Sequence, residues 1–132
     1  MAKLLIVEDN THLQELYQQE LRVEGHDVDI VSTGSEALTY LQSQRPDLIV
    51  LDIVLPGMNG LEVLDKVVAG NRSIPVILHS AYTGYKDHCM TWSADAYVLK
   101  SGDLKELKST IADLLARRRS NDQRQGERRV TA

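Results

Sequence analysis

Short apolar runs alternate along this chain with longer segments whose apolar residues recur every three or four positions. The apolar runs occupy residues 4–7, 28–31, 48–51, 76–78 and 96–99. Runs of this length are typical of β-strands, and the segments between them have the period of amphipathic helices. The alternation predicts an α/β domain of (βα)5 order. We expect an open parallel sheet of five strands with helices on both faces.

The predicted helices have recognisable starts and ends. Asn10 or Thr11 can cap a first helix over residues 11–24. Capping boxes at 33–36 and 103–106 open the second and the last helix, and Gly70 ends the third. A weaker and shorter helix is predicted over 85–93. The expected apolar stripes of the other four helices are Leu13, Leu16, Tyr17 and Leu21; Ala37, Leu38 and Leu41; Leu61, Leu64 and Val68; and Leu104, Leu107, Ile111, Leu114 and Leu115.

Polar side chains that can bind ligands or take part in reactions lie where four of the five apolar runs end. Glu8 and Asp9 follow the first run, and Asp52 follows the third. Ser80 stands at the end of the fourth run and Lys100 at the end of the fifth. The carboxyl ends of parallel strands share one edge of the sheet, and ligands of open α/β sheets bind at that edge. The sequence therefore predicts one acidic pocket with a single cation beside it.

Composition narrows the possible functions. The 132 residues suit one domain, and no apolar run is long enough to span a membrane. The first strand begins almost at once, which leaves no room for a signal peptide. Cys89 is the only cysteine, which excludes an internal disulfide and favours a reducing cytoplasm. The four histidines show no metal-ligand spacing with one another or with Cys89. Among them, His79 is expected to point away from the pocket, because strand neighbours alternate.

Charge divides the chain into an acidic body and a basic tail. The net charge is −4, but from Arg117 onward six arginines face Asp122 and Glu127, a net of +4, so the rest carries −8. An acidic body disfavours nucleic-acid binding by the domain. Residues 118–132 are expected to form a basic, disordered tail, because they contain few apolar residues. The alternative is an interaction arm for an anionic partner.

The strand-end residues form motifs that resemble those of a known family. The chain is similar to the receiver domain of two-component response regulators, of the single-domain, chemotaxis-regulator type with a flavodoxin-like fold. The resemblance covers residues 3 to about 117, within a domain expected at 1–117. Each segment alone is a weak signal, but together and in order they are strong. The segments that carry it are 7–10 (VEDN), 51–60 (LDIVLPGMNG), 79–81 (HSA) and 97–100 (YVLK).

The resemblance implies a function as a phosphorylation-dependent switch. Asp52 would accept a phosphoryl group from the phosphohistidine of a sensor histidine kinase or a phosphotransfer protein. Lys100 and Ser80 would contact phosphoryl oxygens, and Ser80 with Tyr97 would form the switch that alters binding of a downstream protein target. Such a cytoplasmic protein catalyses its own phosphoryl transfer and slow dephosphorylation, but it is not a turnover enzyme.

The family's metal site would lie at the same edge. The family resemblance implies Mg²⁺, with Mn²⁺ as the alternative, held by Asp9, Asp52 and the backbone carbonyl of Val54, while Glu8 would act through a metal-bound water. Mg²⁺ prefers oxygen ligands, and a divalent cation relieves the repulsion among crowded carboxylates, so the residues themselves favour this interpretation.

The sequence departs from the family pattern at the end of the fifth strand. Ser101 follows Lys100, where the family usually has proline after a cis peptide bond. Without proline a cis bond costs about 2.5–4 kcal/mol, so the conformation of this loop is open. Val54 and Tyr82 occupy the variable positions that, by analogy, flank the phosphoryl group, and neither can hold a hydrolytic water as an acid or amide can.

Two other classes of function compete with the switch. A phosphatase of the haloacid dehalogenase kind also uses an aspartyl phosphate, but it needs a second acid two residues after the nucleophile. Val54 occupies that position. A nucleotide-binding or flavodoxin-like module would need a glycine-rich phosphate loop after the first strand. The residues there, 8–11 (EDNT), have the opposite charge.

Overall fold

The computed structural model describes residues 2–70, 73–81, 94–101 and 103–117. Its elements are β1 (Lys3–Val7), α1 (Thr11–Val23), β2 (Asp27–Val31), α2 (Gly34–Ser43), β3 (Leu48–Leu51), α3 (Gly60–Ala69), β4 (Val76–Ser80) and β5 (Ala96–Leu99). A further helix occupies residues 105–117 and is called the C-terminal helix below. The helix predicted over 85–93 and the tail at 118–132 lie outside the described residues.

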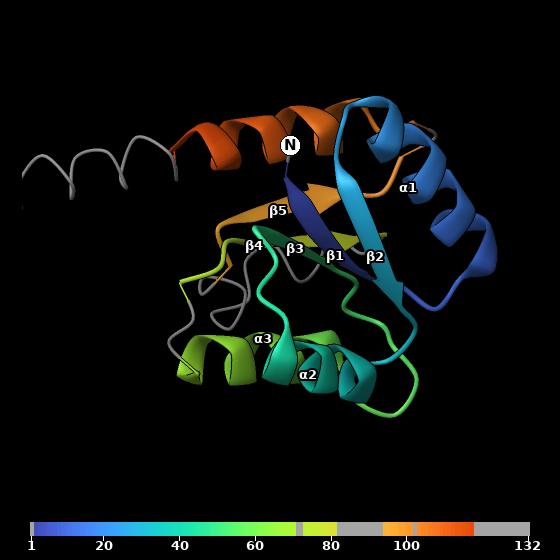
Figure 1. The fold of residues 1–132 in the computed structure, drawn as a ribbon. Coiled ribbons are helices and arrows are strands. Elements are labelled where there is room, and N and C mark those ends of the chain that lie inside the picture. Colours follow the sequence, from blue (N-terminus) through green and yellow to red (C-terminus); the bar gives the residue numbers. More distant parts are fainter. Residues whose placement is uncertain (1, 71–72, 82–93, 102, 118–132) are drawn as a thin grey trace, which may run out of the picture.

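The five strands form one sheet in the order β2-β1-β3-β4-β5, and every pair is parallel. In Figure 1, α1 and the C-terminal helix lie on one side of this sheet, and α2 and α3 lie on the other. The predicted class is confirmed: an α/β fold with an open parallel five-stranded sheet and helices on both faces. In the described part of the chain, no helix has the length and apolar character to cross a membrane.

The alternation of side chains along each strand separates the core into two clusters, one on each face. Leu4 and Ile6 of β1 pack with α1 and the C-terminal helix, whereas Leu5 and Val7 pack with α2 and α3. All four residues of β3 are buried, as the uninterrupted apolar run predicts. This alternation also decides on which face each side chain lies at the carboxyl ends of the strands.

The predicted apolar stripes are confirmed with one exception. All five residues of the last stripe are buried, and so are Tyr17 and Leu21 of α1. Val68 belongs to the apolar stripe predicted for α3, but it is 49% exposed and does not share the buried face with Leu61 and Leu64. The buried face of α3 is centred on Val63, Leu64 and Val67 instead. Val67, rather than the next residue Val68, therefore faces the sheet.

Polar caps fix where the helices begin after the strand-end loops. The side chain of Asn10 accepts a hydrogen bond from the Leu13 N–H, which decides between the two predicted caps of α1. Thr33 accepts from the Glu36 N–H, as its capping box predicts. Asn59 caps α3. Two of these capped helices, α1 and α3, start directly after the loops that carry the acidic residues, so the caps help to set the positions of those loops.

Candidate functional site

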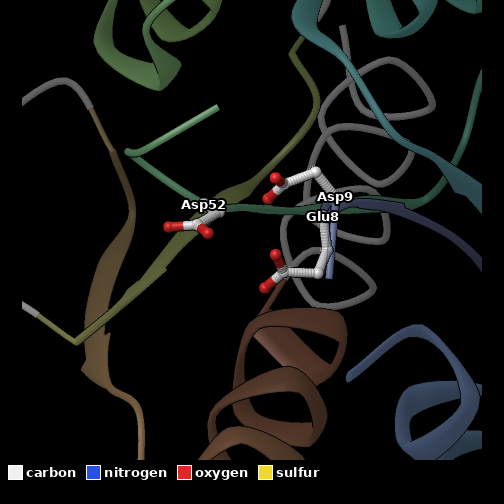
Figure 2. A group of neighbouring side chains, drawn as sticks. All are labelled: Glu8, Asp9 and Asp52. Atoms are coloured by element: carbon white, nitrogen blue, oxygen red, sulfur yellow. The ribbon is translucent and has the colours of Figure 1, made fainter. Parts of the chain in front are cut away.

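Three carboxylates meet at the carboxyl edge of the sheet. The partners Val7 and Leu51 are the last paired residues of β1 and β3, so Glu8 and Asp52 leave neighbouring strands side by side. Oxygens of Glu8, Asp9 and Asp52 all lie within 4.8 Å of one another. Figure 2 shows these three side chains gathered at the ends of the two strands. Glu8 and Asp52 are buried, whereas Asp9 is exposed.

Lys100 joins two of these carboxylates. Its Nζ lies 2.6 Å from Oε1 of Glu8 and 3.0 Å from Oδ2 of Asp52. Burial by itself lowers the pKa of Lys100, but the hydrogen bonds to the two acids outweigh it, so the pKa lies above its ordinary value. The lysine therefore stays an ammonium group. This side chain is the cation that the sequence predicted beside the acidic pocket.

The acidic group carries more negative charge than Lys100 can balance. Burial raises the pKa of Glu8, the hydrogen bond from Lys100 opposes that rise, and the charge of Asp52 adds to it. Crowded carboxylates of this kind favour a bound cation, because it removes both repulsion and the cost of desolvation. Three carboxylates with partly open access fit Mg²⁺, which prefers oxygen ligands and keeps several waters. Among the described residues, this is the one group of three His, Cys, Asp or Glu side chains that lie close enough together to hold a metal ion.

The loop after β3 is held close against Asp52. The Val54 N–H donates to Oδ1 of Asp52 at 3.3 Å, while the Val54 side chain is 51% exposed. The Gly60 N–H, at the start of α3, donates to the carbonyl of Ile53 at 2.7 Å. A Cβ at position 60 would lie 2.0 Å from the carbonyl oxygen of Asp52. Only glycine can occupy this position without moving the backbone of the candidate phosphoacceptor.

Ser80 and Tyr97 lie on adjacent strands, as expected. Ser80 is fully buried at the end of β4, and its carbonyl accepts a hydrogen bond from the Lys100 N–H at 2.7 Å. Tyr97 pairs with Leu78, two residues before Ser80, and packs against the cluster under α2 and α3. The peptide bonds of the described residues, including Lys100–Ser101, are all trans. Tyr82 lies outside the described residues.

Sequence reasoning missed a buried polar pair next to this site. The hydroxyl of Tyr17 lies 2.7 Å from Nδ1 of His79. Ile77 belongs to the cluster under α1, so alternation places His79 on that same face, which is also the face of Glu8 and Asp52. The described contacts of the His79 ring are with Tyr17 under α1 rather than with the carboxylates. The expectation that His79 points away from the pocket stays a prediction.

The surroundings keep both members of this pair neutral. Burial, together with the positive charge of Lys100, lowers the pKa of His79 to about 4. Burial also raises the pKa of Tyr17, and the charges of Glu8 and Asp52 act in the same direction. At neutral pH, the cluster under α1 therefore contains an uncharged imidazole and an un-ionised phenol. A helical period predicts Tyr17 as a core residue, but no periodicity in the sequence indicates its partner.

Comparison with known proteins agrees with this geometry. Residues 4–112 match the model of the response regulator receiver domain. The DNA-binding response regulator MtrA of Mycolicibacterium paratuberculosis is 36% identical over 127 residues, which are 95% of this chain and 55% of that protein. The response regulator ArlR of Staphylococcus saprophyticus is 37% identical over 119 residues, which are 89% of this chain and 54% of that protein. The chain thus spans about half the length of these curated relatives.

The structural neighbours carry the same fold. The response regulator TrrA of Thermotoga maritima, solved in complex with Mg²⁺ and BeF, has a TM-score of 0.83 and 38% identity, and the match covers 86% of this chain and 99% of that one. TrrA in complex with the histidine kinase ThkA matches with a TM-score of 0.82, 38% identity and coverage of 87% and 99%. The acidic group, the paired lysine and these matches lead to one conclusion. The chain belongs to the family of response regulator receiver domains.

Proposed function

We propose that Asp52 accepts a phosphoryl group from the phosphohistidine of a sensor histidine kinase or a phosphotransfer protein. The observation that carries the proposal is the buried carboxylate of Asp52, hydrogen-bonded to Lys100 and grouped with Glu8 and Asp9. The complex between TrrA and the kinase ThkA supports a kinase as the partner. The chain would thus act as a phosphorylation-dependent switch in two-component signalling.

The chemistry requires little of the protein beyond position and charge. An oxygen of Asp52 attacks phosphorus, the bond from phosphorus to the donor nitrogen breaks, and an acyl phosphate forms on Asp52. In this transition state, charge spreads over the equatorial oxygens. The ammonium group of Lys100, already 3.0 Å from Asp52, can pair with one of them. Ser80, at the end of β4, would donate its hydroxyl to another.

The cofactor of this site is Mg²⁺, which would neutralise charge on the transferred phosphoryl group; Mn²⁺ has similar ligand chemistry. Asp9, Asp52 and the backbone carbonyl of Val54 would hold it directly, and Glu8 would act through water. Asp9 is exposed and stands at the open side of the group. Gly60 supports this assignment, because it fixes the backbone between Asp52 and Val54.

The output would be a changed protein-binding surface rather than turnover of an external substrate. Val54 supplies no acid two residues after Asp52, which disfavours a phosphatase of the haloacid dehalogenase kind. MtrA is named as a DNA-binding regulator, but this chain spans only about half of it, so contact with nucleic acid stays disfavoured here by the acidic charge of the domain. The cytoplasmic location expected from the sequence also remains a prediction.

Ser80 and Tyr97 would carry the switch. A phosphoryl group on Asp52 adds negative charge and acceptor oxygens, and Ser80 would move toward it. Tyr97 lies on the same face of the sheet as Leu78, its partner on β4, which precedes Ser80 by two residues. The Tyr97 ring would turn inward and change the surface that a downstream target binds. Beryllofluoride mimics the phosphoryl group. If the NMR signals of the Tyr97 ring stay constant while beryllofluoride saturates the site, this coupling is wrong and phosphotransfer is unaffected.

Acetyl phosphate tests the central proposal. Incubation with Mg²⁺ and acetyl phosphate should add the mass of one phosphoryl group to the intact protein, and Asp52→Asn should abolish the adduct. Asp65 is an exposed aspartate on α3, so Asp65→Asn is a matched control that should be phosphorylated like wild type. An adduct that persists in Asp52→Asn, or is lost in Asp65→Asn, would contradict the assignment.

A further inference from the structure

A buried hydrogen bond joins α1 to β4 inside an otherwise apolar cluster. Tyr17 is 1% exposed and His79 is 3% exposed, and their rings meet edge to face with centroids 5.8 Å apart. Burial of a hydroxyl and an imidazole is costly unless each finds a partner. The 2.7 Å bond between them supplies that partner. Because such a bond has a preferred length and direction, it fixes the relative position of the two elements more sharply than apolar contact does.

The bond lies beside the strand that carries the candidate phosphoacceptor. β3 stands between β1 and β4 in the sheet. Leu51 pairs with Leu78, so the next residues along these strands, Asp52 and His79, lie next to each other. The helix that carries Tyr17 starts directly after the loop with Glu8 and Asp9. The bond thus ties α1, which follows the acidic loop, to β4, and β3 with Asp52 at its end lies between β1 and β4.

A second polar side chain anchors the same helix one turn earlier. The side-chain amide of Gln14 donates to the backbone carbonyl of Glu8 at 2.5 Å and to the hydroxyl of Ser32 at 3.0 Å. Gln14 therefore links α1 to the ends of β1 and β2, while Tyr17 links it to β4. Together the two contacts hold α1 on both sides of the acidic group.

We propose that Tyr17 and His79 are positioning residues for this site: within the frame that the pairing of β1 with β3 sets, their hydrogen bond helps to hold the acidic loop, with Glu8 and Asp9, in place relative to Asp52. Neither residue touches the reacting atoms in this role. Loss of the bond would leave the fold intact but would let α1 shift against β4. The carboxylates would then meet the metal ion and the phosphoryl donor in a less suitable geometry. The inference rests on the proposed phosphotransfer at Asp52.

Two tyrosine variants separate positioning from general stability. Tyr17→Phe removes the hydroxyl that binds His79. Tyr40→Phe is a matched control, because the Tyr40 hydroxyl donates to Asp29 over the same 2.7 Å and ties α2 to β2 on the other side of the sheet. We expect Tyr17→Phe to weaken Mg²⁺ binding, measured by NMR titration, and to slow phosphorylation by acetyl phosphate, each about tenfold. Tyr40→Phe should bind Mg²⁺ and react like wild type.

A double variant keeps the test decisive if Tyr17→Phe folds poorly. In Tyr17→Phe with His79→Leu, both partners are apolar and no buried polar group is left unpaired, so thermal stability should return toward wild type. The weakened Mg²⁺ affinity should persist, since the directional tie is still missing. Full recovery of Mg²⁺ affinity in the double variant, equal effects of Tyr17→Phe and Tyr40→Phe, or no effect of Tyr17→Phe would each overturn the inference. Absence of a phosphoryl adduct on wild type would instead refute the proposed function, while the Mg²⁺ titration would still test the positioning.

Discussion

Replacement of Gly60 by alanine should damage the fold and the site together. The new Cβ would lie 2.0 Å from the carbonyl oxygen of Asp52 and 2.7 Å from Cα of Ile53. Both contacts are with backbone, so α3 or the β3–α3 loop must move by about 1.4 Å to reach ordinary contact distance. Overpacking of this kind costs about 1–3 kcal/mol, and the strained hydrogen bond from Gly60 to Ile53 adds about 1 kcal/mol. Alanine's better helix propensity returns at most about 1 kcal/mol.

The net expectation for Gly60→Ala is a loss of about 1–4 kcal/mol in the free energy of unfolding, a large part of the stability of an ordinary domain. Gly34→Ala is the matched control, because its Cβ would meet side chains, with Cγ2 of Val63 at 2.6 Å and Cβ of Met58 at 3.1 Å. Val63 would have to shift or change rotamer and the Met58 Cβ moves only with its backbone, but neither contact is as short as the one with the Asp52 carbonyl, so we expect a smaller loss than for Gly60→Ala.

Urea unfolding of the two glycine variants and wild type measures these differences, and an NMR titration with Mg²⁺ reports on the site. Gly60→Ala should also bind Mg²⁺ more weakly, because the backbone from Asp52 to Val54 is displaced. The reasoning is refuted if Gly60→Ala unfolds within about 0.5 kcal/mol of wild type. It is equally refuted if Gly34→Ala is the more destabilised of the two.

Further predictions concern the charged and titratable groups of the site. Asp9→Ala should lose Mg²⁺ affinity and phosphorylation together, and a variant that titrates with Mg²⁺ like wild type would refute the ligand assignment. Lys100→Ala leaves the buried Glu8 and Asp52 carboxylates without their cation, so the protein should lose about 3 kcal/mol of stability in thermal or urea unfolding. Added Mg²⁺ should stabilise this variant more than wild type, but its spectral response to phosphorylation should be impaired; an equal response would exclude the lysine from the switch. Because the pKa of His79 lies near 4 in the folded state and at 6.5 ordinarily, the unfolded chain binds the extra proton between these values. The contribution of neutral His79 to the free energy of unfolding should therefore be fully present above about pH 6.5 and fall by roughly 3 kcal/mol toward pH 4. In urea unfolding measured across pH, His79→Leu should remove this part of the pH dependence.

The sequence predicts much of this molecule because periodicity and strand ends are local properties. The apolar runs locate all five strands, and the strand ends bring Glu8, Asp9, Asp52 and Lys100 to one edge. A polar residue before each helix locates its start, as Asn10 does for α1. These features depend on a few neighbouring residues, so a single chain is sufficient to find them.

The remaining features depend on packing between distant elements. The link between Tyr17 and His79 joins residues 62 positions apart, and the strand phase that puts His79 on the α1 face is settled by the sheet register. Val68 has the spacing of a helical apolar stripe, but the orientation in which α3 packs on the sheet leaves it exposed. Lys100 was expected beside the acids, yet its simultaneous contact with Glu8 and Asp52 follows from the reach of its side chain across β4.

The all-parallel sheet also has a consequence for how this chain folds. Lys3 pairs with Asp27, Leu4 with Leu48 and Ile77 with Ala96, so the paired residues lie 24, 44 and 19 positions apart. No two described strands form a hairpin, and each pairing must first close a long loop at an entropic cost. We therefore expect refolding in stopped-flow experiments on the order of milliseconds or slower. Glu8 and Asp52 come together only when β1 pairs with β3, which has the longest separation of these three pairings, so the acidic edge of the sheet should be among the last parts of the molecule to form.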